Sequence, residues 1–140
     1  MVRFTAIVCA FIVCLCAGAA AAEPDMREGK WEITTKVEMS GMPGGIPAQT
    51  MTQCITKKNM VPGPEQTNPN CKMVSSNVSG NTVSWSMTCK EKDGTMESKG
   101  QITYKSDKFT GAMTSLMTQK GEQPVKMTAQ MRGRRIGECK

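Results

Sequence analysis

The sequence predicts an all-β protein: an antiparallel meander of about seven strands that forms a small barrel or a strongly curved half-barrel, with two disulfides. Apolar and polar residues alternate with period two along most of the chain after residue 22, and no stretch repeats convincingly every 3.6 residues. Tight-turn sequences such as Ser79-Gly80-Asn81 separate the alternating stretches. Because no helix is expected to cover the sheet, an apolar inner face has to close on itself.

The first 22 residues are predicted to be a cleaved signal peptide. A positive start is followed by an apolar stretch up to residue 15, and Ala20-Ala21-Ala22 matches an A-x-A cleavage site. An uncleaved membrane anchor is the alternative, but the polar flank Glu23-Pro24-Asp25 argues against it. We therefore expect residues 23–140 to be a single β domain, exported to the periplasm, with no transmembrane segment after cleavage.

The first predicted strand covers residues 30–39, and a shorter strand covers residues 51–55. The Gly- and Pro-rich stretch 41–47 between them is expected to be a flexible loop, which could act as a lid. The inner face of the first strand is formed by alternate residues: Trp31, Ile33, Thr35, Val37 and Met39.

A central hairpin is predicted between Cys71 and Cys89, with its turn at Ser79-Gly80-Asn81 and paired residue numbers that sum to about 160. In this register the apolar residues separate well from the polar ones, which supports it. The predicted inner face contains Cys71, Met73, Ser75, Asn77, Val83, Trp85, Met87 and Cys89, and the outer face contains Lys72, Ser76, Ser84, Ser86 and Thr88.

A second hairpin is predicted to turn at Ser106-Asp107, with paired numbers that sum to about 213, and a final strand begins at Val125. Gly133 is expected to mark a bulge in that last strand. The inner face is then completed by Met96, Gly100, Ile102, Tyr104, Phe109, Gly111, Met113, Met117, Val125, Met127, Ala129 and Met131.

Four cysteines remain after the leader, at Cys54, Cys71, Cys89 and Cys139, and an even number in a small exported domain predicts two disulfides. A four-thiolate metal site is the weaker alternative because no C-x-x-C pair is present. Pairing Cys54 with Cys71 would staple the irregular loop 59–70 and leave Cys89 with Cys139. The hairpin register equally allows Cys71–Cys89 with Cys54–Cys139, and we favour the first pairing slightly.

Methionine is in excess, with 13 residues against two leucines. The predicted register places nine methionines on the inner face, namely Met39, Met51, Met73, Met87, Met96, Met113, Met117, Met127 and Met131, with Met26, Met42 and Met60 outside it. The favoured interpretation is that methionine replaces leucine as core filler. The alternatives are a pocket for an apolar ligand such as an acyl chain, and Cu(I) binding or oxidant protection by thioethers. The predicted ligand-lining residues are Trp31, Met39, Met73, Trp85, Met87, Met96, Tyr104, Phe109, Met113, Met117, Met127 and Met131.

Enzyme classes that need histidine are excluded, because the chain has none. No pair of carboxylates stands out as an acid and base, so we expect a non-enzymatic protein without a cofactor. Lys and Arg are spread over every strand and the aromatic residues face inward, so nucleic-acid binding is not expected. Arg132 and Arg134 share the outer face, where they could contact anionic lipid or polysaccharide.

Short motifs in a specific order give a family resemblance over essentially the whole domain. They are Arg27-Glu28-Gly29-Lys30-Trp31-Glu32-Ile33, Thr52-Gln53-Cys54-Ile55-Thr56, Gly80-Asn81-Thr82-Val83-Ser84-Trp85 and Gly133-Arg134-Arg135-Ile136-Gly137-Glu138-Cys139. The chain resembles the domain-of-unknown-function 3617 family of exported proteobacterial proteins, which implies an envelope protein with four cysteines and no assigned activity.

A second resemblance is to calycin barrels, in which a Gly-x-Trp motif on the first strand packs under an arginine of the last strand. Gly29-Lys30-Trp31 is similar to that motif, and Arg134 or Arg135 would be the arginine. The expected function is an exported periplasmic binding or structural module, with Met-rich Cu(I) binding or oxidant protection as the alternative.

Overall fold

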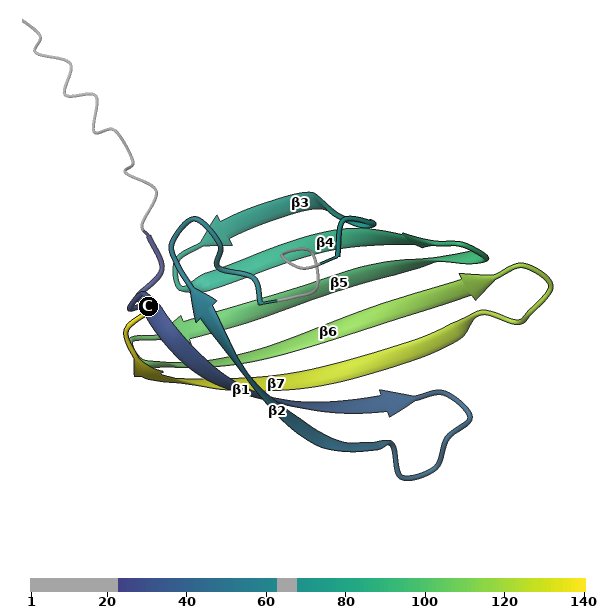
Figure 1. The fold of residues 1–140 in the computed structure, drawn as a ribbon, viewed down its shortest axis with the longest axis horizontal. Helices are drawn as coiled ribbons and strands as arrows, with labels where there is room; N and C mark the ends of the chain where they lie inside the picture. The colour runs from purple at the N-terminus through teal and green to yellow at the C-terminus, as the bar shows by residue number, and fades with distance from the viewer. Residues whose placement is uncertain (1–22, 63–67) are drawn as a thin grey trace, which may run out of the picture.

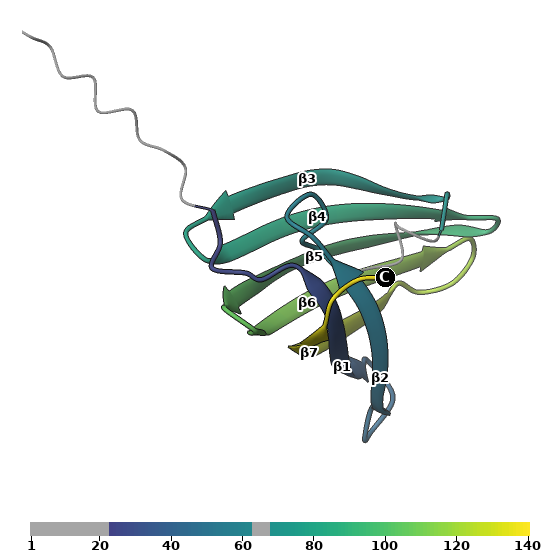
Figure 2. The same ribbon diagram turned by 60° about the vertical axis from the view of Figure 1, so that its left-hand side comes forward.

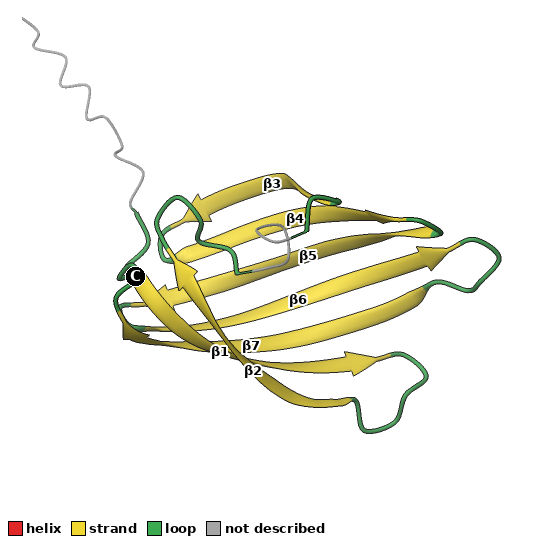
Figure 3. Cartoon of the chain, in the orientation of Figure 1, coloured by secondary structure: helices red, strands yellow, loops and turns green. Residues whose placement is uncertain are grey.

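The computed structural model describes residues 23–62 and 68–140, and the predicted signal peptide lies outside these ranges. Every regular element in the described residues is a β-strand, as predicted (Figure 3). None of the described residues forms a helix long and apolar enough to cross a membrane. The strands are β1 (Gly29–Met39), β2 (Ile46–Ile55), β3 (Cys71–Ser79), β4 (Thr82–Glu91), β5 (Gly94–Lys105), β6 (Lys108–Gln119) and β7 (Val125–Gly137).

The seven strands form one antiparallel sheet with the order β2-β1-β7-β6-β5-β4-β3 (Figure 1). β2 and β3 are the two edges and do not pair with each other, so the sheet is curved but not closed. Of the two predicted shapes, the strongly curved half-barrel is therefore confirmed (Figures 1 and 2). We call its inner side the concave face and its outer side the convex face.

An aromatic cluster closes one end of the concave face. The ring centroids of Trp31, Tyr104 and Phe109 lie 5.5 to 5.9 Å apart, and all three side chains are buried. The segment after β2 covers this end, because the Tyr104 hydroxyl donates a hydrogen bond to the Met60 carbonyl and Val61 is buried. Burial raises the pKa of Tyr104 above its ordinary value. The main core is therefore at this end of the half-barrel.

The hairpin formed by β5 and β6 confirms its predicted register. Its paired numbers sum to 213 from Gly94↔Gln119 to Lys105↔Lys108. The turn lies at Ser106, which adopts a left-handed backbone with φ of 55°. The predicted inward set of this hairpin is thus correct.

The hairpin formed by β3 and β4 follows its predicted register only as far as Met73↔Met87, because Val74 forms a bulge. Beyond the bulge, the numbers of paired residues sum to 161 instead of 160. The prediction was therefore wrong for Ser75 and Asn77, which lie on the convex face, and for Ser76. The physical reason is that the extra residue brings Val78 opposite the buried Val83, so that an apolar side chain faces the core instead of Asn77.

Gly133 does not mark a bulge, contrary to the prediction. It lies in regular register opposite Phe109 and Ile33, and a Cβ at this position would be 2.0 Å from Cε1 of Phe109. The glycine is required because the Phe109 ring packs directly on the backbone of β7. The irregularity of β7 comes later, where Trp31 pairs with Arg135 but Lys30 pairs with Gly137.

The two disulfides join Cys54 to Cys139 and Cys71 to Cys89, so the pairing favoured from the sequence was wrong and its alternative is correct. Cys71 lies directly opposite Cys89 in the β3–β4 ladder. Lys30 of β1 pairs with Cys54 of β2 on one side and with Gly137 at the end of β7 on the other. The Cys54–Cys139 disulfide therefore passes across β1. Its pairing depends on β1 lying between β2 and β7, which the alternation of residues does not reveal.

β2 is longer than predicted, because it begins at Ile46 inside the stretch assigned to a loop. Met51 shares the face of Ile33 in the register, as predicted, but its side chain is 56% exposed. The reason is that β2 is an edge strand with no further strand beside it. Met26 and Met60, which were predicted to lie outside the inner face, pack into or against the core from the segments before β1 and after β2.

Candidate functional site

Two serines lie on the concave face near the middle of β5 and β6, beyond the aromatic cluster. Ser98 of β5 and Ser115 of β6 are directly opposite each other and their hydroxyl oxygens are 2.8 Å apart. Both are buried, at 1% and 3% exposed. Two hydroxyls that bond to each other use only one of their two O–H hydrogens, so the pair keeps a donor.

Methionines surround the serine pair in the sheet. Residues directly opposite or two positions along a strand are nearest neighbours on one face. By this criterion the neighbours of Ser98 and Ser115 are Met96 on β5, Met113 and Met117 on β6, Met87 on β4 and Met127 on β7. We call these five residues the methionine ring.

The sixth neighbouring position is Gly100, and Trp85 fills its place. A Cβ on Gly100 would be 2.5 Å from Cζ2 of Trp85, so the indole packs directly against the β5 backbone at this glycine. Trp85 is 4% exposed. A tryptophan therefore lies at the border of the methionine ring and can report on changes there.

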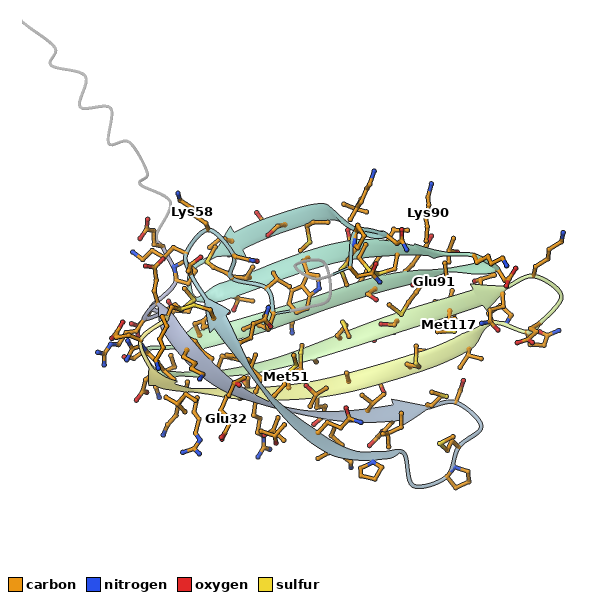
Figure 4. All side chains as sticks on the ribbon, in the orientation of Figure 1. Glu32, Met51, Lys58, Lys90, Glu91 and Met117 are labelled. Atoms are coloured by element: carbon orange, nitrogen blue, oxygen red, sulfur yellow. A yellow bond between two sulfur atoms is a disulfide. The ribbon has the colours of Figure 1, made fainter. Side chains whose placement is uncertain are left out.

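The side chains of the ring lie over the serines. Among the described residues, each strand contacts only its neighbours in the sheet, so no second layer of strands covers this half of the concave face. Met87 is buried, whereas Met96, Met113, Met117 and Met127 are only partly buried (Figure 4 labels Met117). The ring is thus an apolar surface that is partly open to solvent and has small residues beneath it.

The predicted ligand-lining residues divide between the two ends. Trp31, Tyr104 and Phe109 belong to the buried aromatic cluster, and Met131 is buried beside it. Met39 lies opposite Met127 and Met73 lies opposite Met87, so both extend the ring at its flanks. Only the methionine part of the set has partly exposed surface, and contact with a ligand stays a prediction.

Ser98, Ser115 and Gly100 were not singled out from the sequence. All three face inward in the predicted register. The sequence feature that could have identified them is a small residue at an inward position between large ones. The Gly/Pro loop after β1 lies beside this end and forms a groove of about 280 Å³ with Lys36, Glu38 and Met39. Met42 at its tip is 50% exposed.

Arg135, rather than Arg134, is the arginine close to the first-strand motif. It pairs with Trp31 across the β1–β7 ladder, and its Nε donates a hydrogen bond of 2.7 Å to the Glu28 carbonyl. Arg134 points to the convex face, where its Nε is 2.8 Å from a carboxylate oxygen of Glu32. No group of three His, Cys, Asp or Glu residues able to hold a metal ion occurs in the part of the chain that the structure describes.

Residues 26–139 match the model of a family described as a protein of unknown function, DUF3617. The chain belongs to the DUF3617 family. The match includes all seven strands and all four cysteines of the disulfides, so the resemblance drawn from the motifs is confirmed. No curated protein and no solved structure gave a significant match to the chain, and the similarity to calycins stays a hypothesis.

Proposed function

We propose that this DUF3617 protein is an exported, non-enzymatic binding module of the periplasm, and that its methionine ring holds the apolar part of a ligand, such as an acyl chain. The observation that carries the proposal is the ring itself: five methionines around a buried serine pair, four of them partly exposed. A methionine that serves only as core filler is expected to be buried, as Met87 is, whereas these four keep accessible surface on the inward side.

Methionine suits an adaptable apolar surface because its side chain is unbranched, flexible and polarisable. The serines beneath the ring are small, so the thioethers can move aside without opening a gap between strands. Each methylene group that a ligand buries contributes about 0.8 kcal/mol, so an acyl chain of moderate length supplies enough free energy for binding.

The compartment and the lack of catalysis are part of the proposal. Two disulfides are typical of proteins that fold in an oxidising environment, and the residues before Glu23 have the composition of a leader. The absence of histidine from the whole sequence removes the commonest acid–base catalyst.

The test uses the disulfide-bonded protein purified from its own envelope. Extraction with organic solvent and mass spectrometry should identify a bound amphiphile, and fatty acids added to the stripped protein should change Trp85 fluorescence with saturation. Met117→Gln should weaken this binding about tenfold, because a polar amide replaces an apolar contact. Leu116→Gln, an equally polar change at an exposed residue of the convex face, is the control. A clean extract together with unchanged fluorescence overturns the proposal.

Soft-metal binding is a second candidate, favoured by one specific observation. Met96 lies directly opposite Met117, and Met39 directly opposite Met127, so thioethers adjoin in pairs on the ring and its flank. Thioethers suit Cu(I). The double variant Met96→Leu/Met117→Leu separates the two functions: it should keep fatty-acid binding, since leucine is apolar and similar in volume, and lose Cu(I) binding measured against a competing chelator.

A further inference from the structure

The convex face carries two adjoining grooves where β1, β7 and β6 lie side by side. Their volumes are about 330 and 270 Å³, and both are lined by Thr34 and Arg132. The larger groove is also lined by Lys108, Thr110 and Arg134, and by one carboxylate, that of Glu32. These grooves are on the opposite side of the sheet from the methionine ring, so an inference about them is independent of the proposed function.

Positive charges are aligned across three strands beside these grooves. Arg134 on β7 pairs with Lys108 on β6, which pairs with Lys105 on β5. In the next row Arg132 lies between Thr34 and Thr110. Directly paired residues have Cα atoms about 4.5 to 5.5 Å apart, so these cationic side chains are close neighbours.

Few negative charges lie beside Arg134, Lys108, Lys105 and Arg132, which we call the cationic cluster. Glu32, which points away from the concave face in Figure 4, forms an ion pair with Arg134. Among the described residues, the side chains of Arg132, Lys108 and Lys105 take part in no ion pair or hydrogen bond. Like charges directly opposite each other destabilise a sheet, and an anion held between them would remove that cost.

We propose that this groove binds a phosphate group, held by Arg132 and Lys108 with the Thr110 hydroxyl as a further donor. A guanidinium presents a planar fork of N–H donors that matches phosphate oxygens, and a lysine adds a compact charge. A phosphate presents tetrahedrally arranged oxygens to donors that approach from different sides, whereas the two oxygens of a carboxylate lie in one plane. The phosphate belongs either to a lipid headgroup or to a soluble phosphate ester.

The first experiment follows backbone amide shifts of the disulfide-bonded protein by NMR as methyl phosphate is added, with acetate as the carboxylate control. The largest chemical-shift changes should occur at the backbone amides of Thr110 and Arg132. Arg132→Gln and Lys108→Gln should each weaken binding about tenfold, the loss expected for one charge-assisted hydrogen bond. Lys99→Gln removes one positive charge elsewhere on the convex face, opposite Thr114 and Ser86, and should leave binding within about twofold.

Three results would overturn the proposal: equal shifts with acetate, no localised shifts, or equal weakening by Lys99→Gln. Because all three side chains are on the surface, the variants should keep the melting temperature of the parent protein within a few degrees, which the same samples can verify.

The second experiment distinguishes the two sources of phosphate by flotation with phosphatidylglycerol vesicles and with neutral phosphatidylcholine vesicles. Binding to the anionic vesicles that Arg132→Gln abolishes and Lys99→Gln preserves identifies a lipid headgroup. Binding of methyl phosphate without vesicle binding identifies a soluble ester. Vesicle binding that falls equally with either substitution reflects net charge alone and contradicts a built site.

Discussion

At the scale of single residues, Gly133 shows how a missing side chain organises the closed end of the half-barrel. The Phe109 ring occupies the space that a Cβ would need, and it contacts Trp31 and Tyr104 from there. The sequence marked Gly133 as special but did not indicate why, because bulges and ring packing both select glycine.

Gly133→Ala should destabilise the protein by about 1–3 kcal/mol, because the new methyl group displaces a buried aromatic ring in a packed core. Urea unfolding followed by tryptophan fluorescence measures the change. Gly137→Ala is the control, since a Cβ there meets no atom within 4 Å, and it should stay within about 0.5 kcal/mol of the parent. Equal effects of the two substitutions would contradict the packing explanation.

The serine pair beneath the methionine ring makes a second prediction at this scale. Ser98→Ala or Ser115→Ala alone leaves one buried hydroxyl without its partner and should cost about 1–3 kcal/mol. The double substitution removes both polar groups and should recover most of that loss, a coupling that a double-mutant cycle measures. Additive losses would mean that each hydroxyl has another partner in solution.

At the scale of elements, the register of each hairpin follows from which side chains have to face inward. The β5–β6 hairpin was predictable because large apolar residues lie at inward positions on both sides of the turn at Ser106, and the inward residues between them are small. The β3–β4 hairpin was predictable only up to Val74. The polar residues of β3 can lie on the concave or the convex face, so the sequence does not indicate that a bulge is present. Tertiary contact between Val78 and Val83 decides the register there.

The two disulfides should differ in their contribution to stability. Cys71 and Cys89 are 18 residues apart and already paired in a hairpin, whereas Cys54 and Cys139 are 85 residues apart. The loop-entropy model gives about 3 kcal/mol for the first and about 4.5 kcal/mol for the second. Cys54→Ser/Cys139→Ser should therefore lower the free energy of unfolding more than Cys71→Ser/Cys89→Ser. The opposite order in urea unfolding would show that the difference in loop length does not control their stabilisation.

At the scale of the whole molecule, curvature gives the sheet two unlike ends and two unlike faces. One end of the concave face is filled by aromatic residues and covered by the segment after β2, while the other carries the methionine ring. The convex face carries the cations around Arg132. A single sheet can therefore present an apolar and a cationic surface without a second layer.

The sequence by itself determined the class of fold, the number of strands, the turn at Ser106 and the inward position of nine methionines, because period-two alternation depends only on local side-chain direction. Only the tertiary structure decided that β1 lies between β2 and β7, and with it the Cys54–Cys139 disulfide and the open edges. It also decided that five of the methionines surround Ser98 and Ser115. These features depend on which strands become neighbours, and residues distant in sequence carry no local signal of that choice.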